Sequence, residues 1–220
     1  MTLIPALMAI LGERAWEIPR WLERLLPHVD IEGEAVERER HLAAWPGDGS
    51  VVAADDLRAT SGSSAVSFRV APGSAIVAID DDRSELRALA LAVSGRLPAD
   101  DGRLRVAGHL LPGRAAWVRA HVGCVLVDET DAALDDLAEA LRGRSELVVI
   151  DGLDRFDGSR RDQATAMLRD ASARRTLAVF ATASDPSVAR AVLAEAGWPD
   201  AALIDIRARH RASDATEVTA

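Results

Sequence analysis

The residues best suited to chemistry in this sequence lie in two acidic segments, each following an apolar run. Asp80-Asp-Asp-Arg-Ser-Glu85 comes directly after the apolar residues 75–79, and Asp151 comes directly after residues 147–150. Carboxylates at strand ends can attract a cation or repel an anion. All 26 basic residues are arginine, because the sequence contains no lysine. A phosphate site that needs a compact ammonium group therefore has no residue to supply it.

The composition of the chain argues against several classes of function. The formal net charge of -9 and the pI near 5.1 argue against a nucleic-acid partner, because neutralising backbone phosphates requires a net basic surface. A single cysteine, Cys124, excludes an intrachain disulfide and favours a reducing compartment. The five histidines do not have metal-ligand spacing, and we expect no bound metal and no cofactor.

Apolar runs and turn residues alternate along the chain in a way that predicts its elements. After a linker at 46–49, the predicted strands are 51–60, 65–70, 75–79, a hairpin at 104–110, 123–127, 147–150, 177–181 and 202–206. The predicted helices are 83–94, 115–121, 132–142, 160–173 and 186–196, with Asp185 and Pro186 as the N-cap and first position of the last. Such alternation predicts an α/β fold, a parallel sheet with helices on both faces. Trp117 and Trp198 are interpreted as packing residues.

Several segments resemble ATP-binding-cassette (ABC) ATPases, which are P-loop proteins. They are Val66–Gly73, Leu97–Pro112, Val122–Leu126 and, as a Walker B strand, Leu147–Asp151. The resemblance implies a P-loop NTPase-like fold with a small N-terminal β-rich part. Between Val127 and Leu147 only about twenty residues are present, so the family's helical subdomain and its signature motif are predicted to be missing.

The resemblance also places the family's functional positions on this chain. A P-loop needs glycines, a lysine and a Ser/Thr between strand and helix. Those positions fall on Asp80, Asp81, Asp82, Arg83, Ser84, Glu85, Leu86, Arg87 and Ala88, with Leu86 in place of the lysine and Arg87 and Ala88 in place of Ser/Thr. The Walker B aspartate is Asp151, while Gly152 replaces the catalytic glutamate, Val127 a glutamine and Ala183 the switch histidine.

The acidic phosphate site predicts repulsion of nucleotide. At an effective dielectric near 20, a like-charge pair ~4 Å apart costs about 4 kcal/mol before screening. Asp82 and Glu85 have the spacing of an N-cap and its N3 partner, so the protein's own carboxylates are predicted to occupy the former phosphate site. An ordinary capped helix with solvated aspartates remains the alternative.

Residues 1–45 differ in composition from the rest of the chain. An apolar stretch at 3–11, about half of a bilayer span, precedes a group expected at a membrane interface: Trp16, Arg20, Trp21 and Arg24. Residues 1 to about 40 resemble the C-terminal end of an MMPL-type RND transporter. This implies a membrane-proximal helical segment, and that Met1 lies within a longer transporter or a split one. An amphipathic helix packed on the protein's own core is the alternative.

The predicted organisation is a membrane-proximal segment (1–45), a degenerate ABC ATPase-like domain (46–206) and a disordered tail (207–220). The leading hypothesis is an accessory or regulatory domain on the cytoplasmic side of the cell membrane. Its partner would be a membrane transporter or the membrane surface; it would not be an enzyme, and nucleotide binding is not expected. The alternative is a nucleotide-binding ATPase with a non-standard site built on Asp151 and arginines, and a third possibility is a relic of gene decay.

Overall fold

Two sheets of different kinds form the body of the protein. The computed structural model describes residues 45–128, 132–143 and 145–207, which belong to one compact unit that begins at Trp45. The parallel sheet has the strand order β6-β7-β8-β3-β9, and the antiparallel sheet has the order β2-β1-β4-β5. The membrane-interface group predicted at Trp16, Arg20, Trp21 and Arg24 lies outside the described residues.

The observed elements follow the predicted pattern closely. The strands are β1 (Val52–Arg58), β2 (Val66–Val70), β3 (Ala75–Ile79), β4 (Asp101–Val106), β5 (His109–Leu111), β6 (Gly123–Leu126), β7 (Leu147–Asp151), β8 (Ala178–Ala183) and β9 (Ala202–Asp205). The helices are α4 (Arg83–Val93), α5 (Ala115–His121), α6 (Ala132–Arg142), the 3-10 turn η2 (Leu153–Arg155), α7 (Gly158–Ser172) and α8 (Pro186–Glu195). The predicted N-cap role of Asp185 is confirmed, since its side chain accepts from Ser187 N and Val188 N.

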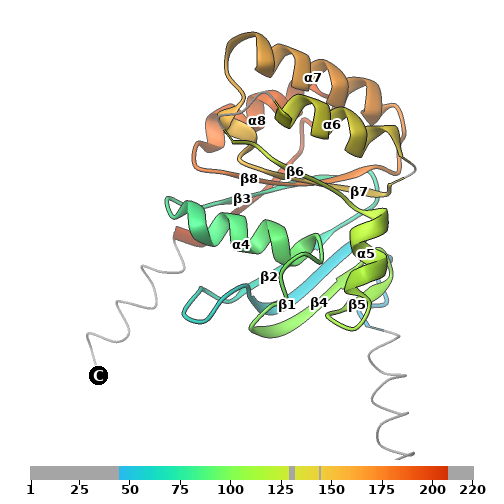
Figure 1. Ribbon diagram of the computed structural model, residues 1–220, viewed down its shortest axis with the longest axis vertical. Coiled ribbons are helices and arrows are strands. Elements are labelled where there is room, and N and C mark those ends of the chain that lie inside the picture. Colours follow the sequence, from blue (N-terminus) through green and yellow to red (C-terminus); the bar gives the residue numbers. More distant parts are fainter. Residues whose placement is uncertain (1–44, 129–131, 144, 208–220) are drawn as a thin grey trace, which may run out of the picture. The chain divides into compact units, whose positions relative to one another are not determined.

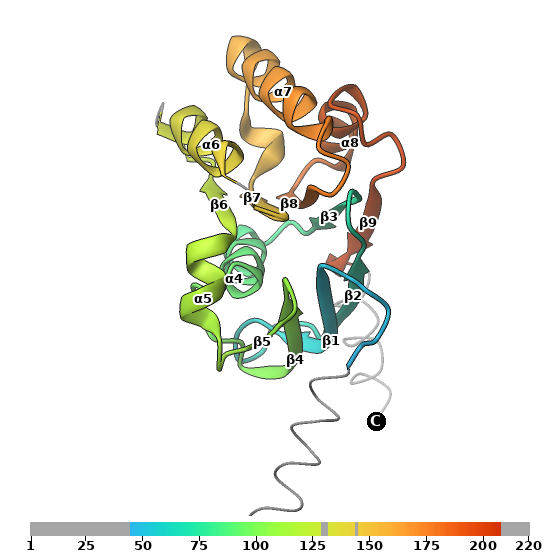
Figure 2. The same ribbon diagram turned by 90° about the vertical axis from the view of Figure 1, so that its right-hand side faces the viewer.

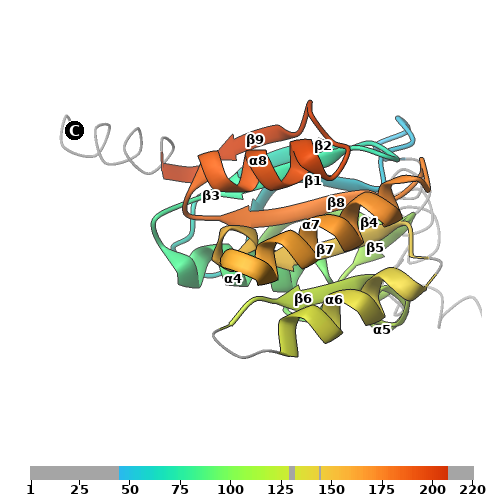
Figure 3. The same ribbon diagram turned by 90° about the horizontal axis from the view of Figure 1, so that it is seen from above.

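The central strands of the parallel sheet are apolar on both faces. Every residue of β3 and β8 is buried, as expected when helices or a second sheet cover each side. Helices α6, α7 and α8 lie on one face, while α4, α5 and the antiparallel sheet lie on the other (Figures 1 and 3). The predicted parallel sheet flanked by helices is confirmed.

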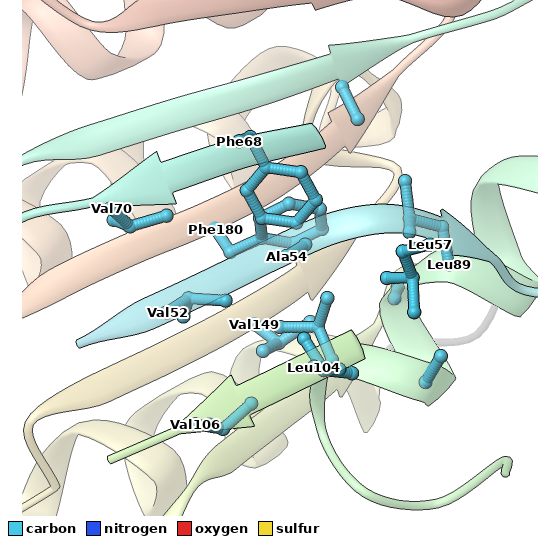
Figure 4. Packing of buried hydrophobic residues seen from close by; sticks show 14 of the residues in the cluster. Val52, Ala54, Leu57, Phe68, Val70, Leu89, Leu104, Val106, Val149 and Phe180 are labelled. Atoms are coloured by element: carbon cyan, nitrogen blue, oxygen red, sulfur yellow. The ribbon is translucent and has the colours of Figure 1, made fainter. Parts of the chain in front are cut away.

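The largest apolar cluster fills the space between the two sheets. Phe68 of β2 stacks on Phe180 of β8, with ring centroids 5.3 Å apart. Val52, Leu104 and Val149 pack around this pair, and all are nearly or fully buried (Figure 4). The two strands predicted at the start of the domain therefore belong to a larger sheet with β4 and β5, whose pairing over long sequence distances no local pattern shows.

Helix α4 is fixed over β7 and β8 by its apolar side. Leu86, Ala88 and Leu89 join the cluster between the sheets, which leaves Arg87 at the flank of the helix. Figure 2 shows α4 in the layer between the parallel and antiparallel sheets. Since α4 directly follows β3, its first turn lies at the carboxyl edge of the parallel sheet. The candidate functional residues meet at this edge.

Candidate functional site

Asp151 is the buried centre of the candidate site. It ends β7 and is only 2% exposed. Its Oδ1 accepts a hydrogen bond from Thr182 Oγ1 at 2.7 Å, and its Oδ2 accepts one from Arg87 Nε at 2.9 Å. The Thr182 hydroxyl also accepts from the backbone N–H of Gly152 at 3.0 Å. A buried carboxylate is tolerated when it is paired and hydrogen-bonded in this way.

Arg87 bridges two carboxylates from neighbouring strands. Its Nη2 donates to Asp128 Oδ1 at 2.5 Å, while its Nε is bonded to Asp151. These hydrogen bonds, first from Asp151 and then from Asp128, raise the pKa of the Arg87 guanidinium above its ordinary value. In turn, the hydrogen bond from Arg87 holds the pKa of the Asp128 carboxyl below its ordinary value. The Arg87 bridge, defined as Arg87 with Asp151 and Asp128, therefore joins α4 to the ends of β6 and β7.

Two further arginines act on Asp128. Arg155, in the turn after β7, lies 3.7 Å from Asp128 Oδ1, and it donates from Nη1 to the carbonyl of Val127 at 2.7 Å. Arg83, the first residue of α4, is exposed and adds to the positive field that lowers the pKa of Asp128. We call Arg83, Arg87 and Arg155 the arginine cluster. With Asp128 and Asp151, it carries a net charge of one positive unit, which suits an anion.

The first turn of α4 is capped by the protein itself. Asp82 Oδ1 accepts from the backbone N–H groups of Ser84 at 2.8 Å and Glu85 at 3.4 Å, and from Ser84 Oγ at 2.6 Å. The prediction that Asp82 is the N-cap is thus confirmed. The Asp82 carboxylate lies where helix amides would otherwise bind a phosphate.

The four carboxylates expected to face a triphosphate each have a different hydrogen-bond donor. Asp80 is buried, and its Oδ1 accepts from the backbone N–H of Asp82. Asp81 accepts from Arg207 Nη1 at 3.0 Å, and Glu85 accepts from the backbone N–H of Ser64 at 3.0 Å. Of the four, Asp82 is the one whose side chain accepts from amides of the α4 first turn.

The other predicted site residues fall into the core. Leu86 and Ala88 pack between the sheets, and Ala183, at the switch position, is fully buried on the opposite face of the parallel sheet. Val127 is also buried, whereas the next residue, Asp128, projects into the site. Sequence reasoning missed Asp128, Arg155 and Thr182. The available signal was the parallel pairing of β6 with β7, which brings the residues after Leu126 beside Asp151.

A magnesium ion does not fit these residues in the way the resemblance implies. P-loop NTPases hold Mg²⁺ between the P-loop Ser/Thr and the Walker B aspartate. Here those positions are Arg87 and Asp151, and their side chains are bonded to each other. Among the described residues, no group of three or more His, Cys, Asp or Glu side chains is placed to hold a metal ion.

Comparisons with known proteins show solved structures with a similar fold and one membrane protein that is similar over a short stretch of sequence. No model of a known protein family matches the chain. Over 39 residues, the chain is 49% identical to "Membrane protein YdfJ" of Bacillus subtilis (strain 168); the match covers 18% of this chain and 5% of that protein. Within the described ranges, no helix has both the length and the apolar character to cross a membrane.

Solved structures resemble the domain at low sequence identity. One is cbiO1 of Clostridium perfringens, part of the ABC transporter complex cbiONQ, with a TM-score of 0.50 and 7% identity, covering 66% of this chain and 82% of that chain. Another is a bacterial ABC transporter cassette, MJ0796, with a TM-score of 0.48 and 10% identity over 63% and 90% of the two chains.

The likeness to cbiO1 corrects one prediction. The expectation that the chain is not an enzyme is contradicted, because this structural neighbour is an ABC ATPase, a class of ATP-hydrolysing enzymes. The protein has the α/β fold, with its parallel sheet, of the ABC transporter ATPase cassettes.

Proposed function

We propose that this chain is an ABC ATPase-like, nucleotide-binding module of a membrane transport system, with a non-standard site centred on Asp151. The observation that carries the proposal is the Arg87 bridge at the carboxyl edge of the parallel sheet. In place of a P-loop lysine, the arginine cluster offers planar guanidinium groups, which bind phosphate oxygens through paired hydrogen bonds. In place of a bridging metal ion, Arg87 supplies the positive charge between two carboxylates.

The membrane part of the proposal rests on the match to YdfJ and on the fold. The matched protein is a membrane protein by name. In the sequence, residues 1 to about 40 resemble the end of an MMPL-type RND transporter. A module of this kind belongs on the cytoplasmic side of the membrane, with the transporter as its partner. We also propose that the helical subdomain of ABC cassettes is reduced here to the short connection that contains α6.

Nucleotide binding is tested by the rise in Tm with ATP. We expect millimolar ATP to raise Tm, because a ligand that binds only the folded state stabilises it. The variant R155A should show a smaller rise, since it removes one member of the arginine cluster. The matched control is R190A, which removes an exposed arginine of α8 that is not a member of the arginine cluster. An unchanged Tm at millimolar ATP contradicts nucleotide binding at this site.

Hydrolysis is followed in the same samples as released phosphate. Turnover that disappears in D151N assigns the chemistry to the candidate site, whereas turnover that D151N leaves unchanged comes from elsewhere. In D151N, the amide oxygen can still accept the hydrogen bond from Thr182, and we therefore expect the variant to fold. Circular dichroism checks its folding.

A second candidate function is an accessory or regulatory domain that works through protein contacts rather than nucleotide. The capped first turn of α4 favours it, because Asp82 already satisfies the amides that a phosphate would use. The two functions separate in the ATP titration. An accessory domain shows no rise in Tm with ATP, yet co-purifies with the transporter.

A further inference from the structure

One part of this acidic protein carries no acidic residue at all. Residues 102–127 contain no Asp or Glu, although the whole chain has a formal net charge of -9. The same segment contains six arginines and histidines: Arg103, Arg105, His109, Arg114, Arg119 and His121. It forms most of β4, then β5, α5 and β6. Charge is therefore distributed unevenly over the surface.

The charges on this segment are not all compensated. Arg103 pairs with Asp55 at 3.2 Å, and Arg105 donates to the carbonyl of Trp45. By contrast, Arg119 donates to a neutral acceptor, the carbonyl of Gly95, at 3.0 Å. Within the described part of the chain, no ion pair is recorded for Arg119 or Arg114. Both are exposed, so α5 presents two uncompensated positive charges to solvent.

An exposed tryptophan of α5 lies between a histidine of the same helix and a histidine of β5. Trp117 is 37% exposed and is the large apolar side chain that the described residues leave in solvent. His109 of β5 lies 3.9 Å from its ring centroid, and His121 stacks on it at 3.9 Å with an interplanar angle of 8°. The expectation that Trp117 is a packing residue is wrong. On α5, the residue that enters the core is Val118.

An apolar pocket opens beside this face. It has a volume of about 270 Å³ and is lined by the end of α4, by β4 and β5 and by α5. Leu97, Leu104 and Leu111 give it an apolar wall, and Arg96 and Arg119 add two positive charges. Figures 1 and 2 both show α5 beside β5 at the end of the antiparallel sheet. We call Arg114, Trp117 and His121, with His109 of β5, the α5 face; Arg119 lies in the wall of the pocket beside it.

We propose that the α5 face docks on an anionic phospholipid surface. Tryptophan favours the headgroup region of a bilayer, where its ring is buried and its N–H stays wet. An arginine near an anionic membrane surface is attracted to it. The acidic remainder of the chain is repelled by the same surface, which orients the domain with α5 toward the lipid.

The described domain begins at Trp45, which contacts residues of the antiparallel sheet. Trp45 lies between the guanidinium groups of Arg69 and Arg103, at 5.3 and 5.0 Å, and its Nε1 donates to Asp55. Arg103 and Arg105 belong to β4, which pairs with β5 through Val106 and His109. The preceding segment is the one proposed to be membrane-proximal. The inference rests in this respect on the membrane location given under the proposed function.

A site-specific probe tests the docking in the full chain. A fluorophore sensitive to polarity is attached at Ala120→Cys on the α5 face, in a C124A background that removes the native thiol. The matched control is Ala194→Cys, an exposed alanine of α8 on the other side of the parallel sheet. We expect a brighter and blue-shifted emission at position 120 with phosphatidylcholine vesicles that contain phosphatidylserine. Vesicles of phosphatidylcholine alone, and the probe at position 194, should give no such change.

Charge variants give the second measurement. R114E should weaken the vesicle response of the position-120 probe at least about fivefold, since it removes one attraction and adds one repulsion. R190E, the same reversal on α8, should leave the response unchanged or nearly so. Added salt should reduce it, as for any surface charge attraction.

The outcomes separate the docking from the membrane location. A chain that sediments with vesicles while the probe at position 120 stays silent overturns the docking and leaves the membrane location standing. A chain that binds no vesicles, with a silent probe, overturns both. A response at position 120 to soluble phosphate or to a neutral vesicle shows that the face does not select an anionic membrane surface, which also overturns the proposal.

Discussion

Arg87 is the side chain on which the candidate site depends. It connects two carboxylates, and one of them, Asp151, is buried. Removing it in R87A leaves Asp151 with Thr182 as a partner and without a counter-charge. Because hydrogen bonds to charged groups contribute ~1.5–3 kcal/mol and Arg87 is 37% exposed, we expect a loss of about 2 kcal/mol in the free energy of unfolding. Urea denaturation measures it.

The control for R87A is R190A on α8, which should change the free energy of unfolding by less than about 0.5 kcal/mol, as for most surface substitutions. R87K should recover only part of the loss, since an ammonium cannot reproduce the planar fork that reaches both carboxylates. Equal stability of R87A and R190A would show that the bridge contributes nothing to the fold.

Asp128 gives the site a pH dependence. Its pKa is lowered in the folded protein, chiefly by the hydrogen bond from Arg87. A group with a depressed folded pKa adds stability that is present above its unfolded pKa, near 3.9, and that is lost as the pH falls toward the folded value. We expect the Tm difference between the wild type and D128N to be largest near neutral pH and to shrink below about pH 4. A difference that grows on acidification would reverse the assigned sign.

Asp128 also shows what sequence reasoning could not reach at this scale. The resemblance placed the glutamine position on Val127, one residue too early for the side chain that projects into the site. Val127 and Asp128 follow the end of β6, where the backbone N–H of Asp128 turns back to donate to the carbonyl of Leu126 at 3.1 Å, and no strand periodicity predicts which side chain enters the site. The prediction that Trp117 is a packing residue was wrong for a different reason. A seven-residue helix has too few positions for a periodic pattern to identify its buried side.

At the scale of elements, the strands and helices could be predicted because apolar runs and caps agree. The five buried residues of β3 and the cap at Asp82 are both readable from local sequence. The antiparallel sheet was not, because β1 pairs with β4 across the whole of β3 and α4. Its pairing depends on packing against the parallel sheet, through contacts such as Phe68 on Phe180.

The caps of α4 and α8 allow a matched comparison. Asp82 and Asp185 each accept from the backbone N–H groups two and three residues later and from a serine hydroxyl. Each of D82A and D185A should lower Tm, because each removes an N-cap. Only D82A should raise the affinity for ATP, because it frees amides at the carboxyl edge of the parallel sheet. Calorimetric titration of both variants with ATP checks this. Equal ATP affinities would show that the amides capped by Asp82 take no part in binding ATP.

Gly73 fixes the turn before β3. Its φ is +74°, and a Cβ added there would collide with the carbonyl oxygen of Arg175. Gly62, with φ of +89° and no neighbour within 4 Å, is the control. G62A should cost about 1 kcal/mol for the left-handed backbone alone, and G73A should cost about 1–3 kcal/mol more for the collision. Similar Tm values for the two variants would contradict this account of the turn.

At the scale of the whole molecule, the parallel sheet carries at its carboxyl edge the positions on which the resemblance places the P-loop and Walker B residues. Leu86, which the resemblance places at the lysine position, lies in the core, and Arg87, which it places at a Ser/Thr position, is bonded to Asp151. An arginine at the flank of α4 thereby satisfies the buried aspartate. The α5 face is a second feature, separate from this edge, and it is a basic surface in an acidic chain.

The most direct test of the account is the dependence of ATP affinity on magnesium. If Arg87 stands where a metal ion bridges in related cassettes, the wild type should bind ATP equally well with Mg²⁺ and with a chelator. R87S, which restores a hydroxyl beside Asp151, should bind ATP more tightly with Mg²⁺ than without. Wild-type binding that requires Mg²⁺ would contradict the central claim.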